Sequence, residues 1–323
     1  MRIFVSTCLA ACALYGQPGK LQSPSAGYVF DGSSQMLRRI QGIPGAALIG
    51  DGVDFGFAIG AATVSPRLDS AIVLSSDGAP HLFKLSTDGA VEISIAGLTA
   101  PQRVVFSPSG KAAALFADGS VQVIRGLPDS ATLAATVAMH GVSKSRGPAP
   151  AISTVAISAL AISALAISDD GAYLLYAANG RVELTGVAGD SRILLNATPG
   201  ALVAFAPSSH DVAITHAGTL TIFLDVTGAA TRRDVPEISS PSAVAFSADG
   251  RSIFVASESN RAVKAIETAT GTAAALACDC APTALVSMGS LFRLNEMSSA
   301  PLWLLDASTA PRLVFVPAKS DSQ

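Results

Sequence analysis

The chain has 323 residues, of which 50% are hydrophobic and 14% charged, and its formal net charge is −3. This charged fraction lies below the roughly 25% of a typical globular protein, and so apolar a composition argues against disorder. Nucleic-acid binding is not expected, because phosphate contacts need clustered Lys and Arg and the sequence has no basic block. Beyond the N-terminus there is no uninterrupted run of about 18 apolar residues, so no transmembrane span is expected.

The N-terminus has the layout of a secretory signal peptide. Met1-Arg2 supplies positive charge, and residues 3–14 form a mainly apolar stretch that is too short to span a bilayer. A polar linker, 17–26, follows this stretch. We expect a signal peptide over 1–16 with cleavage after Gly16, and cleavage after Ala13 is the alternative.

A second type of export signal overlaps the first. Leu9-Ala10-Ala11-Cys12 resembles the bacterial lipobox, in which the cysteine is lipidated and becomes the first residue. Cys12 is therefore a candidate lipidation site. Both signals predict a protein outside the cytoplasm, either periplasmic or secreted.

Export would determine which of the four cysteines remain in the mature chain and whether they can form a disulfide. Cys8 and Cys12 precede the expected mature chain or lie at its start, which leaves Cys278 and Cys280. A disulfide across one intervening residue is geometrically demanding, yet an oxidising compartment allows it. Free thiols are the alternative. A metal site would be incomplete, because zinc needs four ligands and no other Cys or His pair lies nearby.

The strongest pattern in the sequence is an internal repeat. Each copy has an apolar strand, a turn rich in Ser, Pro, Asp and Gly, and a second apolar strand. The residues that end the first strand are Val64, Phe106, Ile167, Phe205, Phe246 and Val286. The intervals between them are 42, 61, 38, 41 and 40 residues. Four of the five match the roughly 40–45 residues of a four-stranded propeller blade.

The clearest copy contains four predicted strands. They are Ala243–Phe246, Ser252–Ala256, Ala262–Ile266 and Thr272–Ala277. Asp-Gly, Ser-Asn and Thr-Gly pairs supply the turns between them, and helical periodicity is essentially missing. We therefore predict an all-β protein, a β-propeller of four-stranded blades. It forms one domain over 27–318 and is followed by a polar tail, 319–323.

The number of blades depends on how the N-terminal strands are counted. Six units span Ala62 to Pro317. Ahead of them, Tyr28–Asp31 and Leu37–Gln41 predict two strands, and Ala46–Leu48 and Phe55–Ala58 are candidates for two more. We expect seven blades with an irregular first blade. Six blades closed by an N-terminal strand is the alternative.

One blade carries a resemblance to a known family. Residues 254–271 closely resemble the consensus of the YVTN-type β-propeller repeats of bacterial secreted and surface proteins. Val29–Asp31, Leu224–Asp225 and Leu305–Asp306 are similar to degenerate ends of the third strand of such a repeat. The Trp-Asp and Gly-His signatures of WD40 repeats are absent. The whole chain also looks like the exported propellers abundant in soil bacteria such as Acidobacteria.

The resemblance implies a fold and an extracytoplasmic location, but it implies little about function. Propellers serve both as enzymes and as binding modules.

The 61-residue interval contains a low-complexity insertion at 139–165. Copies of a five-residue repeat begin at Ala151, Ala156, Ala161 and Ala166. Only the last copy lies where the innermost strand of a blade belongs. We interpret the insertion as a duplication packed as an extended hairpin. A loop that covers one face of the ring is the alternative.

The sequence contains no recognisable catalytic constellation. Its histidines are His81, His140, His210 and His216, and none has the spacing of a metal motif. His210, next to Asp211, and His216 are interpreted as turn residues. The innermost strands carry mainly Ser, Pro and Ala at the channel mouths, and Arg103 is the one obvious charge there. We predict no catalytic, cofactor-binding or metal-binding residue, and Arg103 as a candidate channel-mouth contact.

These observations favour an exported propeller that works as a binding or scaffolding module. Its partner would be a protein or a small ligand docked on one face of the ring, and no cofactor is implied. Two alternatives remain open. One is a lactonase- or hydrolase-like enzyme, for which the fold alone argues. The other is an envelope structural protein held by a lipid at Cys12.

Overall fold

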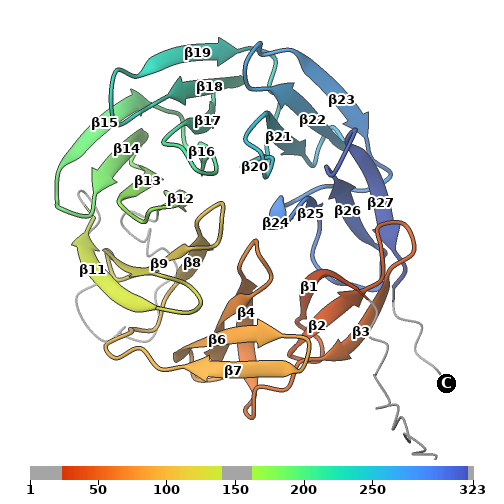
Figure 1. Cartoon of the computed structure of the whole chain (residues 1–323). Helices are drawn as coiled ribbons and strands as arrows, with labels where there is room; N and C mark the ends of the chain where they lie inside the picture. The colour runs from red at the N-terminus through yellow and green to blue at the C-terminus, as the bar shows by residue number, and fades with distance from the viewer. Residues whose placement is uncertain (1–23, 140–161, 319–323) are drawn as a thin grey trace, which may run out of the picture.

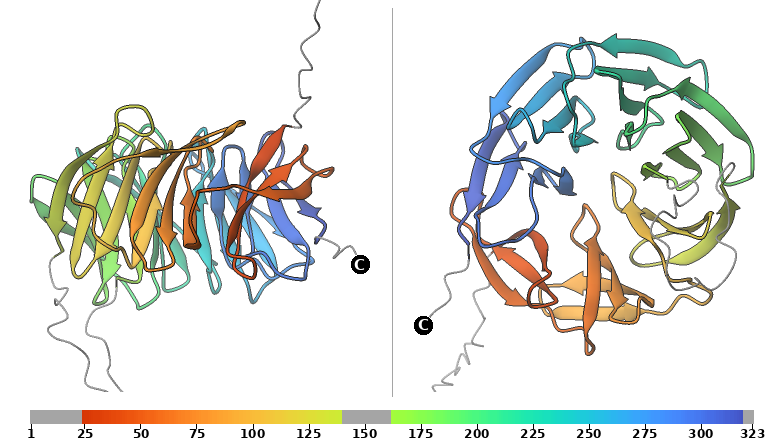
Figure 2. Two further views of the ribbon diagram at one scale, coloured as in Figure 1. Left: turned by 90° about the horizontal axis from the view of Figure 1, so that it is seen from below. Right: turned by 180° about the vertical axis from the view of Figure 1, so that it is seen from behind.

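The described part of the molecule is a ring of antiparallel sheets. A computed structural model describes residues 24–139 and 162–318, which form 27 β-strands and no helix. Seven sheets surround a central axis like the blades of a propeller (Figure 1). Seen from the side, they form a flat disc (Figure 2). The predicted all-β propeller is confirmed, with seven blades rather than six.

We number the blades in chain order. Blade 1 contains β1 (Ser25–Asp31), β2 (Met36–Gln41) and β3 (Leu48–Gly52). Blade 2 contains β4 (Ile59–Val64), β5 (Ser70–Ser75), β6 (Pro80–Ser86) and β7 (Gly89–Ile93). Blade 3 contains β8 (Arg103–Phe106), β9 (Ala112–Ala117), β10 (Ser120–Arg125) and β11 (Thr132–Ala138). Blade 4 contains β12 (Ala164–Ile167), β13 (Tyr173–Ala178), β14 (Arg181–Gly186) and β15 (Ser191–Asn196).

The remaining blades follow the same plan. Blade 5 contains β16 (Leu202–Phe205), β17 (Val212–His216), β18 (Thr219–Leu224) and β19 (Thr231–Val235). Blade 6 contains β20 (Ala243–Phe246), β21 (Ser252–Ser257), β22 (Ala262–Glu267) and β23 (Ala273–Ala277). Blade 7 contains β24 (Val286–Met288), β25 (Leu291–Arg293), β26 (Leu302–Asp306) and β27 (Arg312–Val316).

Several sequence predictions fall on residues that the structure does not describe. The signal peptide, Cys12, most of the insertion at 139–165 and the tail at 319–323 lie outside the described residues. β1 begins at Ser25, so the last two residues of the predicted linker, 25 and 26, belong to this strand. Within the described residues, no helix is long and apolar enough to cross a membrane.

The hydrophobic core lies between the faces of neighbouring blades. In each four-stranded blade the strands pair in chain order, and the first strand is innermost (Figure 1). The second strands are the most buried, and all six residues of β9 are buried. Phe254 in blade 6 and Phe292 in blade 7 meet across such an interface, with ring centroids 5.2 Å apart. A strand covered on both faces needs apolar side chains on both, which explains its continuous hydrophobic run.

Among the described residues, blade 1 has no innermost strand. It has three strands, and β1 pairs only with β2. The burial pattern of β2 closely matches that of β22, the third strand of blade 6. β1 therefore corresponds to a second strand, and the prediction that Asp31 ends a third strand is wrong. The candidate strand Phe55–Ala58 is also absent, so the irregular first blade is one strand short.

The turn after the inner strand requires a left-handed residue. Gly110, Gly171 and Gly250 occupy this turn in three blades, with φ of 72°, 67° and 72°. An added Cβ at Gly171 would lie 2.8 Å from Arg125 Nε and 3.2 Å from Ala112 Cβ, both in the preceding blade. A side chain there would meet both backbone strain and a steric conflict.

We expect Gly171→Ala to lower the free energy of unfolding by about 2 kcal/mol, because strain and crowding add. Gly289→Ala is the matched control, since Gly289 has φ 70° and nothing lies within 4 Å of its added Cβ. The control should lose only the strain, about 1 kcal/mol. Denaturant unfolding measures both values, and equal losses would contradict the steric part of this explanation.

Candidate functional site

A cavity of about 270 Å³ lies on the propeller axis. Six of the seven blades contribute to it, and blade 1 does not. The lining residues are Thr63, Val64, Pro66, Val105, Phe106, Ser107, Pro108, Leu165, Ala166, Ile167, Ala204, Phe205, Pro207, Val244, Ala245, Phe246, Ser247, Ala248, Leu285, Val286 and Ser287. These residues include four hydroxyl side chains and no charged one.

The sequence of the inner strands explains why the axis is hollow. Ala166, Ala204 and Ala245 occupy inner strands of three successive blades and line the cavity. An alanine side chain extends only one carbon from the backbone, so these strands leave the axis unfilled. The cavity lies just below the usual size range of ligand pockets, roughly 300–1,000 Å³. It suits a small ligand.

The rim beside the cavity contains an aspartate that joins three blades. Asp169 follows the lining residue Ile167 by two positions. Its Oδ1 accepts a hydrogen bond from Ser109 N in blade 3 at 2.6 Å, and its Oδ2 accepts one from Ser208 N in blade 5 at 2.7 Å. Two backbone donors therefore hold this carboxylate in place, and the two hydrogen bonds connect the turns of blades 3, 4 and 5 beside the cavity.

The neighbouring aspartate holds a histidine of the next blade. Asp170 Oδ2 lies 3.0 Å from His210 Nε2, and His210 Nδ1 lies 3.0 Å from Thr227 Oγ1. Burial opposes ionisation of Asp170, but hydrogen bonds from Ser168, the Ala172 N–H and His210 outweigh it and lower the pKa of this carboxyl. The cluster is a half-exposed polar contact between blades 4 and 5.

The sequence interpretation of the histidines is refined by these contacts. His210 lies in the connection between β16 and β17, and its partner is Asp170 and not the adjacent Asp211. The prediction that His216 is a turn residue is wrong: it is the last residue of β17, and its Nε2 lies 3.0 Å from Thr221 Oγ1. The repeat itself could have revealed the Asp170 contact. Residues separated by one period of about 40 occupy the same turn in adjacent blades.

Arg103 lies at the start of β8 and is exposed. Its Nη1 donates a hydrogen bond to the Ser163 carbonyl at 3.0 Å. It is not among the residues that line the cavity, so its role as a channel-mouth contact stays a prediction. Within the described residues, no group of three His, Cys, Asp or Glu side chains is placed to hold a metal ion.

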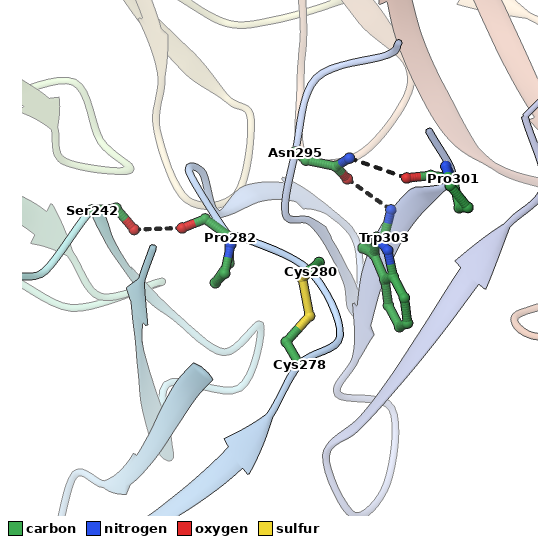
Figure 3. Close-up of a disulfide and its surroundings, with 7 residues drawn as sticks. All are labelled: Ser242, Cys278, Cys280, Pro282, Asn295, Pro301 and Trp303. Atoms are coloured by element: carbon green, nitrogen blue, oxygen red, sulfur yellow. Dashed lines mark hydrogen bonds between the residues drawn. A yellow bond between two sulfur atoms is a disulfide. The ribbon is translucent and has the colours of Figure 1, made fainter. Parts of the chain in front are cut away.

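Cys278 and Cys280 are joined by a disulfide in the connection between β23 and β24 (Figure 3). Both cysteines are buried in the cluster between blades 6 and 7. Further along this connection, the Pro282 carbonyl accepts a hydrogen bond from Ser242 Oγ at 2.6 Å. Trp303, on β26, packs against the same cluster, and its backbone N–H donates a hydrogen bond to Asn295 Oδ1 at 2.7 Å (Figure 3). The disulfide therefore belongs to the packing between two blades.

The disulfide closes a very short loop, and this limits its contribution to stability. In the chain-entropy description, a loop of three residues constrains the unfolded chain by about 1.5 kcal/mol. We expect Cys278→Ala/Cys280→Ala to lower the free energy of unfolding by about that amount. Denaturant unfolding of the variant, beside the unaltered chain with and without a reductant, tests this. Failure of the reduced chain to fold would contradict it.

Comparison with known proteins supports the class that the fold defines. No protein-family model matches the chain, and no curated protein matches it. A solved protein of unknown function from Desulfotomaculum acetoxidans DSM 771 is similar over 91% of this chain and 100% of its own, with TM-score 0.54 and 12% identity. A protein from Bacteroides uniformis ATCC 8492, provisionally described as a 6-phosphogluconolactonase, is similar over 90% of this chain and 95% of its own, with TM-score 0.54 and 14% identity.

At these identities the similarities show the fold alone. The chain is a seven-bladed β-propeller with an apolar axial cavity. Neither neighbour assigns an activity to it.

Proposed function

We propose that this protein is an exported binding module that holds a small uncharged ligand in its central cavity. The observation that carries the proposal is the chemistry of the lining, which is apolar apart from hydroxyl groups and has no charged side chain. A charged ligand would lose its hydration there without gaining a counter-charge. A small uncharged molecule gains apolar contacts, and the hydroxyls orient it.

The proposed placement outside the cytoplasm rests on two features. The N-terminus has the layout of a secretory signal peptide, and the Cys278–Cys280 disulfide is of a kind that persists in oxidising compartments. The likeness of residues 254–271 to YVTN-type repeats supports the same placement. The protein is then periplasmic or secreted.

The lactonase-like alternative lacks a chemical group at the cavity. A general acid or base has to lie within hydrogen-bond reach of the substrate, and none of the described lining residues titrates near neutral pH. Asp169 lies on the rim, but both of its oxygens already accept backbone hydrogen bonds. Binding is therefore the better-supported function.

A thermal-shift screen of the full chain tests the proposal, with uncharged small molecules extracted from culture medium as the probes. Ala245→Leu fills part of the cavity, and Ala275→Leu makes the same change on exposed β23 of the same blade. A stabilising compound should act on the unaltered chain and on Ala275→Leu, but not on Ala245→Leu. Equal stabilisation of all three proteins would refute binding in the cavity.

Lipid anchoring is the second question about export. Cys12 lies outside the described residues, and its lipidation remains an expectation from sequence. Cys12→Ser should leave the protein soluble outside the cytoplasm if the signal peptide is cleaved after Gly16. Loss of a membrane-bound fraction on this substitution would instead identify a lipoprotein.

A further inference from the structure

Among the residues that the structure describes, the inner edge of blade 1 is unpaired at the place where the six other blades have an inner strand. Hydrogen bonding along an antiparallel pair alternates between the two sides of a strand. The Leu37 carbonyl accepts a hydrogen bond from Val53 N, so the main-chain N–H and C=O groups of Leu37 point away from β1. Phe30 pairs with Leu37 and Tyr28 with Arg39, so the N–H and C=O groups of Phe30 and Tyr28 point away from β2.

These groups lie in a mostly buried environment. Tyr28 is 8% exposed and Phe30 is partly buried, yet β1 pairs with no strand other than β2 among the described residues. Buried main-chain groups that lack partners are costly, and an open sheet edge readily pairs with an added strand. In blade 6 the corresponding edge of β21 pairs with β20.

A leucine occupies part of the position that the missing strand leaves. The N–H of Leu68 bonds to the Ser65 carbonyl, as the N–H of Gly110 bonds to Ser107 and that of Gly250 to Ser247. Leu68 therefore stands at the glycine position of the turn, with φ 62°. Its side chain packs against the cluster between blades 7 and 1 and the cluster between blades 1 and 2.

The other side of the position is covered by blade 7. The sulfur of Met288 lies against Gly27 of β1, and Gly289 N donates to the Pro66 carbonyl at 2.7 Å. Two side chains and one hydrogen bond thus close the inner edge. A methionine is flexible, and a leucine with a left-handed backbone costs of order 1 kcal/mol, so this closure is displaceable.

We propose that this inner edge binds an extended apolar segment of a partner protein, which pairs with Tyr28 and Phe30 as the fourth strand of blade 1. The inner strands of the other blades define the chemistry of the segment. They include Val-Val-Phe in β8, Ala-Leu-Ala-Ile in β12 and Ala-Val-Ala-Phe in β20. The segment is about four residues long, uncharged and without proline, and main-chain hydrogen bonds supply much of its affinity.

The residues just before β1 do not have the composition of such a segment. Elsewhere the inner strand directly precedes the second strand in sequence, which here corresponds to the residues just before β1. The expected mature chain has Gln-Pro-Gly-Lys-Leu-Gln-Ser there, at 17–23, and the pair Pro18-Gly19 disfavours a strand.

Hydrogen exchange of the exported full chain tests the proposal without any substitution. The probe is the peptide Ser-Ala-Val-Ala-Phe-Ser-Ala, the sequence of residues 242–248. A control peptide has proline at the positions of Val244 and Ala245. The Tyr28 and Phe30 amides should exchange quickly alone and slow about tenfold or more with the probe, and the control peptide should not slow them. Protection of both amides before any peptide is added would overturn the proposal, as would equal effects of the two peptides or no effect of either.

A substitution provides an independent readout. Leu68→Gly removes the side chain that covers the site and introduces the residue found at this turn position in three other blades, so the probe should bind several-fold more tightly. Leu48→Ala, on exposed β3 of the same blade, should leave the affinity unchanged. Weaker binding to Leu68→Gly than to the unaltered chain would contradict the assigned site.

Discussion

Replacing Asp31 by Asn should lower the free energy of unfolding by about 3 kcal/mol, because it leaves a largely buried Arg38 without a counter-charge. Arg38 Nε lies 2.8 Å from Asp31 Oδ2, and the two side chains are only 11% and 8% exposed. Ser33 and Ser34 also donate hydroxyl hydrogen bonds to this carboxylate, both at 2.6 Å. The Asn amide would present a second donor to Arg38. Denaturant unfolding followed by fluorescence or circular dichroism measures the loss.

An exposed ion pair provides the control for Asp31→Asn. Asp129 lies 2.6 Å from Lys84, and the two side chains are 72% and 51% exposed. Asp129→Asn should leave the unfolding midpoint unchanged, because solvent already screens this pair. Similar losses in the two variants would mean that burial does not determine the effect.

The same carboxylate makes stability depend on pH. Burial opposes ionisation of Asp31, but the hydrogen bonds from Ser33, Ser34 and Arg38 outweigh it and hold the pKa of Asp31 far below its ordinary value. A lowered pKa in the folded state stabilises the protein above the unfolded pKa of about 3.9. We expect this stabilisation to be lost as the pH falls below that value, and Asp31→Asn to show a weaker loss in acid.

Leu68→Ala should lower the free energy of unfolding by about 2 to 3 kcal/mol, because its side chain packs between the two clusters that flank blade 1. Leu48→Ala makes the same change at a residue that is 64% exposed, and it should cost little. Denaturant unfolding compares the two variants. A small loss for Leu68→Ala would mean that other side chains fill the position of the missing strand.

A glycine variant separates backbone strain from packing at this position. Alanine is ordinarily the less destabilising replacement, but a residue with φ 62° is strained unless it is glycine. Leu68→Gly should therefore be more stable than Leu68→Ala by roughly 0.5 to 1 kcal/mol. The usual order, with alanine more stable, would contradict the assigned strain.

The repeat made most of the propeller predictable from sequence. Five residues of the series end inner strands in the structure, because each repeat folds as one unit and contacts its neighbours. The sixth, Val286, was also predicted to end a strand, but it is the first residue of β24. Blade 1 was less predictable, since Val29–Asp31 resembles a strand end in several blades. The position of β1 in the blade became clear only from the structure, in which β1 is the edge strand of a three-stranded sheet and pairs with β2 alone. The short apolar stretch 55–58 shows the same ambiguity.

The candidate site could be predicted only in part. Its uncharged lining follows from the inner-strand sequences, but the size of the cavity depends on how strands such as β12, β16 and β20 pack around the axis. The Asp170–His210 contact joins residues 40 apart and needed the repeat register to be recognised. Leu68 gave no sequence signal beyond its replacement of a turn glycine. Its role arises because the neighbouring blade 1 has no inner strand among the described residues.

The most direct test of ligand binding in the central cavity is native mass spectrometry of the protein, purified after export by the cells that produce it. The unaltered chain and Ala275→Leu should each retain one small uncharged molecule per chain, and Ala245→Leu should retain none. Retention of the same molecule by all three proteins would contradict binding in the central cavity. So would conversion of the molecule to a product, since that would make the propeller an enzyme.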